Sequence, residues 1–213
     1  MASTGTITLA FTGASGLPYG LRVLECLLAA EKRVYLIYSS AAQIVARQEL
    51  DMILPSQPAA ATAELAERFH AKPGQLIVFG REDWFAPVAS GSNVADAMAV
   101  CPCSMGTLGA LAAGLASNLI GRAADVMLKE RRPLVLVPRE TPLSTIHLEN
   151  MLRLSRAGAV ILPPSPGFYG RPHDISDLID FVVARILDHL DVPHRLGPRW
   201  GDERVAPPLV QRT

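Results

Sequence analysis

The sequence has few charged residues, few cysteines and no long apolar run. Charged side chains make up 19% of the 213 residues and the formal net charge is +0, so the basic excess of a nucleic-acid-binding protein is missing. The three cysteines fit a reducing compartment, and the pair Cys101 and Cys103 has no further Cys or His nearby to complete a metal site. No run of 18 apolar residues could cross a bilayer, and the N-terminus lacks a signal-peptide pattern. These absences predict a cytoplasmic protein that binds neither nucleic acid nor membrane.

What is present is a long alternation of apolar strands and helices. Strands are predicted near residues 7–11, 33–38, 76–79, 97–101, 134–137 and 159–162. Helices are predicted near residues 17–31, 40–50, 105–117, 119–130, 144–157 and 174–190, with a further alanine-rich helical piece within residues 55–75. Strands that alternate with helices form a parallel sheet covered on both faces, so we expect an α/β protein with three layers. Residues 1–191 are predicted to form one domain, and residues 192–213 a proline-rich tail that contributes Trp200.

The first strand is followed by a glycine turn, in the sequence ITLAFTGASGLPYG. The chain breaks at residues 13–16 and restarts as a helix with Pro18 in its first turn, where a missing N–H costs nothing. Backbone N–H groups and the positive end of the helix dipole then meet at one point, which is a favourable place for a phosphate. An ordinary tight turn would have the same pattern, so the turn alone does not establish a nucleotide site.

Small, polar and charged residues follow almost every predicted strand. Ligands of open parallel sheets bind beyond the carboxyl ends of the strands, so this convergence predicts a binding site there. A short-chain dehydrogenase would need Tyr and Lys four residues apart, and no tyrosine of this chain has that partner. The second strand ends in Ser39 and Ser40 where an NAD site would have an acid, and no Gly-Lys-Ser/Thr follows the glycines. The sequence therefore argues against a dinucleotide-binding site and against a P-loop.

The chain resembles the UbiX family of flavin prenyltransferases over about residues 5–201. The resemblance is carried by TGASGLPYG, the serine pair after the second strand, the block from Cys101 to Met151 with VPRETPL, and PSPGFYGRP. It implies a Rossmann/flavodoxin-like fold in which residues 1–191 bind FMN. It also implies metal-independent transfer of a dimethylallyl group from dimethylallyl monophosphate to reduced FMN. The resemblance further implies that the prenylated FMN is passed to a UbiD-family decarboxylase, in ubiquinone biosynthesis among other settings, and that the enzyme is a large homo-oligomer, a dodecamer.

The resemblance also assigns site residues. Those implied in FMN binding are Gly13, Ala14, Ser15, Ser39, Ser104, Met105, Gly106, Thr107, Arg122 and Arg139. Those implied in holding the prenyl phosphate are Ser90, Gly91, Lys129, Arg139, Tyr169 and Arg185, with Arg185 reaching in from a neighbouring subunit. Those implied in catalysis are Ser15 and Glu49 for proton transfers, Glu140 as donor to the departing phosphate, and Trp84 and Trp200 as aromatic faces.

The residue types fit that chemistry without the resemblance. Prenyltransferases that use magnesium carry Asp-rich motifs, and this chain has no DDxxD, so cationic side chains must stabilise the leaving phosphate instead. Arg122 and Lys129 are seven residues apart on one predicted helix and therefore share a face. By composition alone, any one Lys or Arg is a solvated surface charge. Trp84 and Trp200 lie in predicted loops, where an indole could equally anchor a lid.

Two other functions stay open as alternatives. Flavin-dependent cysteine decarboxylases share the glycine turn, but they need a His shortly before the strand that precedes Ser104, and this chain has none between His70 and His147. They also carry a PxMNxxM-like motif where this chain has PRETPLSTIHLENM. A non-catalytic flavin-storage protein is the third reading, and it would not need the basic residues at 122, 129, 139 and 185.

Overall fold

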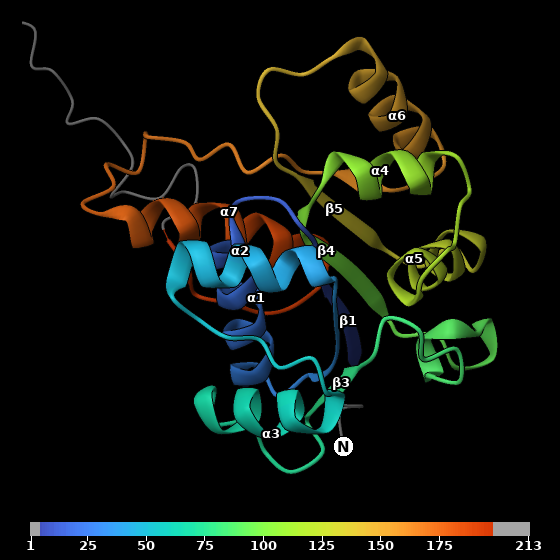
Figure 1. Cartoon of the computed structure of the whole chain (residues 1–213). Helices are drawn as coiled ribbons and strands as arrows, with labels where there is room; N and C mark the ends of the chain where they lie inside the picture. The colour runs from blue at the N-terminus through green and yellow to red at the C-terminus, as the bar shows by residue number, and fades with distance from the viewer. Residues whose placement is uncertain (1–4, 198–213) are drawn as a thin grey trace, which may run out of the picture.

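A six-stranded parallel sheet is the centre of the structure, a computed structural model that describes residues 5–197 (Figure 1). Its strands lie in the order β3-β2-β1-β4-β5-β6, which is the Rossmann order. The strands are β1 (Thr6–Phe11), β2 (Arg33–Tyr38), β3 (Leu76–Phe79), β4 (Ala97–Cys103), β5 (Leu134–Pro138) and β6 (Val160–Ile161). The neighbours β1 and β4 have connections that leave in opposite directions, so a crevice opens beyond their carboxyl ends.

Helices cover both faces of this sheet. One face carries α1 (Leu17–Ala29), α2 (Ser40–Leu50), α3 (Pro58–Arg68) and α7 (Ile175–His189). The other face carries α4 (Met105–Ala112), α5 (Leu119–Lys129) and α6 (Thr145–Arg156), and two short 3-10 turns, η1 (Pro87–Ala89) and η2 (Gly91–Asn93), precede β4. In Figure 1, α4 and α6 lie together at one end of the molecule, while α1 and α7 lie side by side.

Strand side chains alternate between two hydrophobic clusters. In β1, Leu9 and Phe11 pack toward α1 and α7, whereas Ala10 packs toward α4 and α5. β5 does the same with Val135 on one side and Leu136 on the other, and all of these side chains are fully buried. This is why the strands read as nearly continuous apolar runs.

Helix α1 lies unusually close to the sheet. A Cβ on Gly20 would collide with the carbonyl oxygen of Cys101 and would come within 2.8 Å of the Phe11 ring. A glycine at this position lets the helix backbone approach β4 directly. The close approach brings the start of α1 to the β1–β4 crevice.

The predicted three-layer, single-domain α/β fold is confirmed, with two changes in element boundaries. Helix α4 ends at Ala112 and not near 117, because Gly114 adopts a left-handed backbone conformation with φ of 72°. The strand expected to end at Cys101 continues to Cys103. Within residues 5–197, no helix is long and apolar enough to span a membrane. Of the predicted tail, residues 198–213 with Trp200 lie outside the described residues.

Candidate active site

A buried threonine joins the two loops that flank the crevice. The Thr12 hydroxyl donates to the carbonyl oxygen of Pro102 at 2.8 Å and accepts from the N–H of Ser104 at 2.7 Å. Thr12 is 1% exposed, so both hydrogen bonds are protected from water. The end of β1 is thereby fixed to the start of α4. Sequence reasoning counted Thr12 only among the polar residues that follow the first strand and did not predict that it joins the two loops.

The glycine turn has two backbone donors to offer a ligand. Within the described chain, the N–H groups of Gly13 and Ser15 donate to no protein atom. A Cβ on Gly13 would collide with the Cβ of Ala41, so a glycine allows the turn to lie against the start of α2. Ser39 caps that helix by accepting from the N–H of Ala42 at 3.1 Å. The turn thus contacts the first residues of the helix that Ser39 caps, which suits a phosphate site shared by the turn and Ser39.

The Glu49 carboxylate accepts hydrogen bonds from the first free N–H groups of α1. It accepts from the N–H of Gly16 at 3.0 and 3.1 Å and from the N–H of Leu17 at 3.0 Å. A negative charge is stabilised at a helix N-terminus, and here the protein supplies that charge itself. The helix start therefore has fewer donors for a phosphate than the sequence indicated, and those of Gly13 and Ser15 remain.

Arg139 lies on the other side of the same turn. Its Nε donates to the carbonyl oxygen of Ser15 at 3.2 Å, and its backbone N–H donates to the carbonyl oxygen of Cys103. Glu140 follows, and its carboxylate accepts from the N–H of Thr141 at 3.0 Å. Ser104 caps α4 by accepting from the N–H of Thr107 at 3.2 Å. At this edge the structure gathers Gly13, Ala14, Ser15, Ser39, Glu49, Ser104, Met105, Gly106, Thr107, Arg139 and Glu140.

A second group of predicted residues surrounds α5. Arg122 donates through Nε to the carbonyl oxygen of Ala89 at 2.9 Å and forms an ion pair with Asp125 at 2.8 Å. Lys129 is paired with Glu130, and a Cβ on Gly91 would collide with that carboxylate. Arg122 and Lys129 both face the segment from η1 to η2, which confirms their shared helix face. Ser90 lies in this segment and caps η2.

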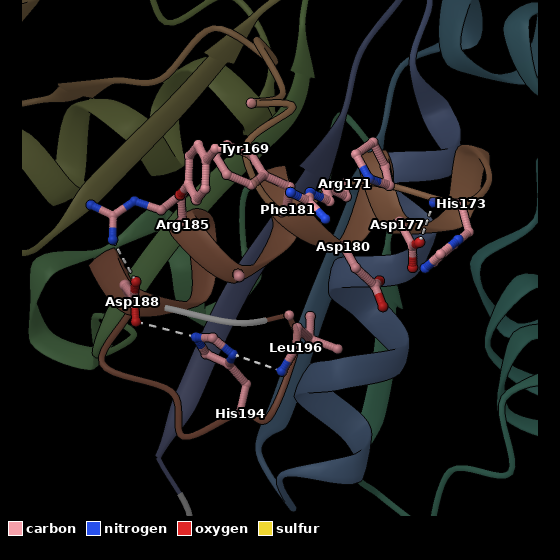
Figure 2. Close-up of a pocket in the computed structure, with 15 residues that line it drawn as sticks. Tyr169, Arg171, His173, Asp177, Asp180, Phe181, Arg185, Asp188, His194 and Leu196 are labelled. Carbon is pink, nitrogen blue, oxygen red and sulfur yellow. Dashed lines mark hydrogen bonds and ion pairs between the residues drawn. The ribbon is translucent and has the colours of Figure 1, made fainter. Parts of the chain in front are cut away.

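A third group lines a pocket of about 1020 Å³ beside α7 (Figure 2). Tyr169 packs edge-on against Phe181, with ring centroids 5.5 Å apart. Arg185 lines the same pocket and forms an ion pair with Asp188 at 2.7 Å. Figure 2 shows Tyr169 and Arg185 as neighbours in the same part of the pocket.

One chain does not bring the first and second of these groups together. Lys129 ends the helix that precedes β5, and Arg139 follows β5 at its other end. The five residues of this strand span roughly 16 Å at about 3.3 Å per residue. Trp84 lies in the loop after β3 and is 47% exposed. A site built from all the predicted phosphate ligands therefore requires more than one subunit.

The cysteines contribute neither a nucleophile nor a metal site. Burial raises the pKa of the Cys103 thiol to about 12 and raises that of Cys101 further, so both remain protonated near neutral pH. Partial burial raises the pKa of Cys26 to about 11. In the part of the chain that the structure describes, no group of three His, Cys, Asp or Glu residues is arranged to hold a metal.

Comparison with known proteins first defines the class. Residues 1–187 match the Flavoprotein family, so the crevice belongs to a flavin-binding fold. The flavin prenyltransferase UbiX of Pseudomonas aeruginosa is 58% identical over 206 residues, which are 97% of this chain and 99% of that protein. The chain therefore belongs to the UbiX family of flavin prenyltransferases.

Solved structures of UbiX proteins have the same fold as this chain. A structure of AnUbiX (PadA1) in complex with FMN and dimethylallyl pyrophosphate is 45% identical, covers 92% of this chain and 97% of that one, and superposes with a TM-score of 0.82. A dodecameric, FMN-dependent UbiX-like decarboxylase from Escherichia coli O157:H7 is 41% identical, covers 92% of this chain and 98% of that one, and superposes with a TM-score of 0.80.

Cysteine decarboxylases are much less similar to this chain than the UbiX proteins are. The FMN-dependent cysteine decarboxylase TvaF is 18% identical and covers 89% of this chain and 99% of that one, with a TM-score of 0.57. Such a match shows a shared fold alone. Membership in the UbiX family likewise argues against a protein that only stores flavin.

Proposed function

We propose that this enzyme transfers a dimethylallyl group from dimethylallyl monophosphate to reduced FMN. The observation that supports this most is the pair of free N–H donors of Gly13 and Ser15 at the β1–β4 crevice, beside Ser39 and Arg139. The collision that a Cβ on Gly13 would cause fits a turn that must keep this shape. These residues suit an FMN phosphate, with the start of α4 (Ser104 to Thr107) beneath the ring system. Metal independence is part of the proposal.

In the reaction, the bond between the allylic carbon and the phosphate oxygen breaks, and the electron pair leaves with the phosphate. Reduced FMN, when bound, supplies the nucleophilic centre that receives the dimethylallyl group. Glu49 is held beside Ser15 by the two N–H groups of α1, which orients its carboxylate for moving a proton there. Arg139 keeps donors beyond its Nε for the leaving phosphate, and Glu140 protonates that phosphate as it departs.

The remaining phosphate ligands come from neighbouring subunits in this proposal. Lys129 with Ser90 and Gly91 lies at one place on the chain, and Tyr169 with Arg185 at another. Lys129 lies at the opposite end of β5 from Arg139, and the residues that line the α7 pocket include none of the glycine turn. A homo-oligomer, a dodecamer by relation to the E. coli protein, would bring the groups together. Trp84 and Trp200 would close the site with aromatic faces and exclude water.

The deciding experiment measures the flavin after reaction. Reduced FMN and dimethylallyl monophosphate are incubated with the protein, and the flavin is then analysed by mass and absorption spectrum. The expected product is FMN heavier by one dimethylallyl group, with release of one equivalent of phosphate. Dimethylallyl diphosphate is tested in parallel to distinguish the two leaving groups. Unchanged FMN with both donors would contradict the proposal.

The product would then pass to a UbiD-family decarboxylase in the cytoplasm. This step is supported by the family relationship alone. It predicts that an inactive, flavin-free decarboxylase gains activity when mixed with the reaction products. Gain of activity with unreacted FMN alone would contradict it.

A further inference from the structure

Among residues 5–197, an acidic side chain in the α7 pocket has hydrogen bonds to two different side chains. One oxygen of Asp188 (Oδ2) accepts from Nη1 of Arg185 at 2.7 Å, and the other (Oδ1) lies 3.1 Å from Nε2 of His194. Figure 2 shows the three side chains in a row, with Asp188 in the middle. Neither Asp188 nor His194 was singled out by the sequence or assigned a role by the family resemblance.

The tautomer of the neutral His194 ring follows from the hydrogen bond at its second nitrogen. Nδ1 accepts from the backbone N–H of Leu196 at 3.2 Å, so this nitrogen carries no proton. In the neutral ring, Nε2 then carries the hydrogen and donates a hydrogen bond to the carboxylate of Asp188. The His194 side chain is only 7% exposed, so this hydrogen bond is well shielded from water.

Burial increases along the row from Arg185 to His194. The exposed fractions of the side chains are 56% for Arg185, 24% for Asp188 and 7% for His194. The arginine is therefore the accessible end, while the histidine anchors the other end inside the protein. Because Val192 also donates its N–H to the carbonyl oxygen of Leu187, the segment 192–197 is fastened to α7 at two places.

We propose that Asp188 and His194 are positioning residues for prenyl transfer, an inference that rests on the function proposed above. Asp188 takes one donor of the Arg185 guanidinium and leaves the others directed away from it, toward the phosphate of the prenyl donor. His194 fixes Asp188 in turn. A long, exposed arginine side chain otherwise samples many rotamers, and holding it in one of them lowers the entropy lost when phosphate binds.

The central test replaces Asp188 with asparagine. An asparagine has one acceptor oxygen for two donors, so Asp188→Asn breaks one of the two contacts and leaves Arg185 unpaired in charge. The expected result is a rise of about tenfold in KM for dimethylallyl monophosphate, with kcat reduced less than threefold and FMN affinity unchanged. In an Arg185→Ala background, Asp188→Asn should cause no further loss, because it acts only through Arg185.

The matched control is Glu25→Gln. Glu25 forms an ion pair with Arg22 at 2.7 Å with the same three-residue spacing, but on α1 and outside the pocket. This variant should leave KM unchanged. His194→Phe removes the Nε2–H without altering the carboxylate, and it should raise KM in the same direction as Asp188→Asn.

The outcomes separate this inference from the proposed function. If the wild-type enzyme forms no prenylated FMN, the proposed function fails. If the wild type is active and Asp188→Asn has the wild-type KM, or still lowers activity in the Arg185→Ala background, the positioning role is refuted. If Asp188→Asn does not fold, His194→Phe carries the test, and a wild-type KM in that variant refutes the role.

Discussion

A single carboxylate decides what the start of α1 can bind. Glu49 is at the far end of α2, yet its oxygens accept from Gly16 and Leu17. The glycine turn therefore divides its donors between an internal carboxylate and the solvent-facing crevice. An FMN phosphate bound at the turn as proposed would lie next to Glu49, whose carboxylate is held beside Ser15, where proton transfer is proposed.

Replacing Glu49 with glutamine tests both roles of the carboxylate. Glu49→Gln keeps an acceptor but loses the negative charge at the helix N-terminus, which lowers the free energy of unfolding by about 1 kcal/mol. Prenyl transfer should fall at least a hundredfold, because an amide does not exchange a proton with the flavin site. Calorimetry and single-turnover flavin spectra measure the two effects. Glu67→Gln, at an exposed carboxylate of α3, is the control, and equal activity loss in both variants would contradict the role of Glu49.

The glycine turn makes a separate prediction for flavin binding. In Gly13→Ala the added methyl group collides with Ala41 and pushes the turn away from α2. The dissociation constant for FMN, measured by fluorescence titration, should rise by at least about tenfold, equivalent to about 1.4 kcal/mol. Gly80→Ala is the matched control, because its Cβ would meet only Pro58 at an ordinary 3.6 Å. Unchanged FMN affinity in Gly13→Ala would argue against a phosphate at this turn.

At the scale of elements, the packing of α1 on β4 holds the site in place. Gly20→Ala inserts a methyl group against the carbonyl oxygen of Cys101, and overpacking of this kind costs about 1–3 kcal/mol. The thermal midpoint should fall by several degrees. Gly109→Ala, inside α4 with its nearest neighbour at 3.4 Å, should be neutral or stabilising. A midpoint for Gly20→Ala at or above that of Gly109→Ala would contradict the close approach of α1.

Most elements could be predicted from the sequence because their signals are local. The apolar strands, the serine caps of α2 and α4, and the residues at the carboxyl edge all follow from short patterns. The contact of Glu49 with Gly16 and the hydrogen bond of Asp188 with His194 could not be predicted. Glu49 lies 33 residues from Gly16 along the chain, and an exposed carboxylate has no pattern that distinguishes it from a solvated one. The end of α4 was missed because a run of alanine and glycine fits a helix until one glycine turns left-handed.

At the scale of the whole molecule, mixed assemblies test whether subunits share sites. Arg185→Ala should leave FMN binding intact and reduce prenyl transfer roughly ten- to hundredfold, since a charge-assisted hydrogen bond is worth about 1.5–3 kcal/mol. Mixing Arg185→Ala subunits with Lys129→Ala subunits should restore part of the activity, because some sites then regain both cations. Persistent inactivity after demonstrated subunit exchange would contradict separate donors for the two residues.

Metal independence is the second prediction at this scale. The sequence has no Asp-rich motif, and its cations are proposed to stabilise the leaving phosphate in place of magnesium. Turnover should therefore be the same with and without EDTA. It is measured by phosphate release and by the absorption spectrum of the flavin. Loss of turnover in EDTA with recovery on adding magnesium would overturn this account.

The position of Lys129 and Arg139 at opposite ends of β5 has a consequence for inheritance. If a subunit gives Lys129 to one site and Arg139 to another, a substitution at either position disables one site per defective chain and leaves that chain's other contribution intact. A cell that produces sound and singly defective chains in equal amounts would then lose about half of its activity, as it would by losing one gene copy. Substitutions at these two positions would therefore be recessive, and an allele defective at Lys129 would partly complement an allele defective at Arg139.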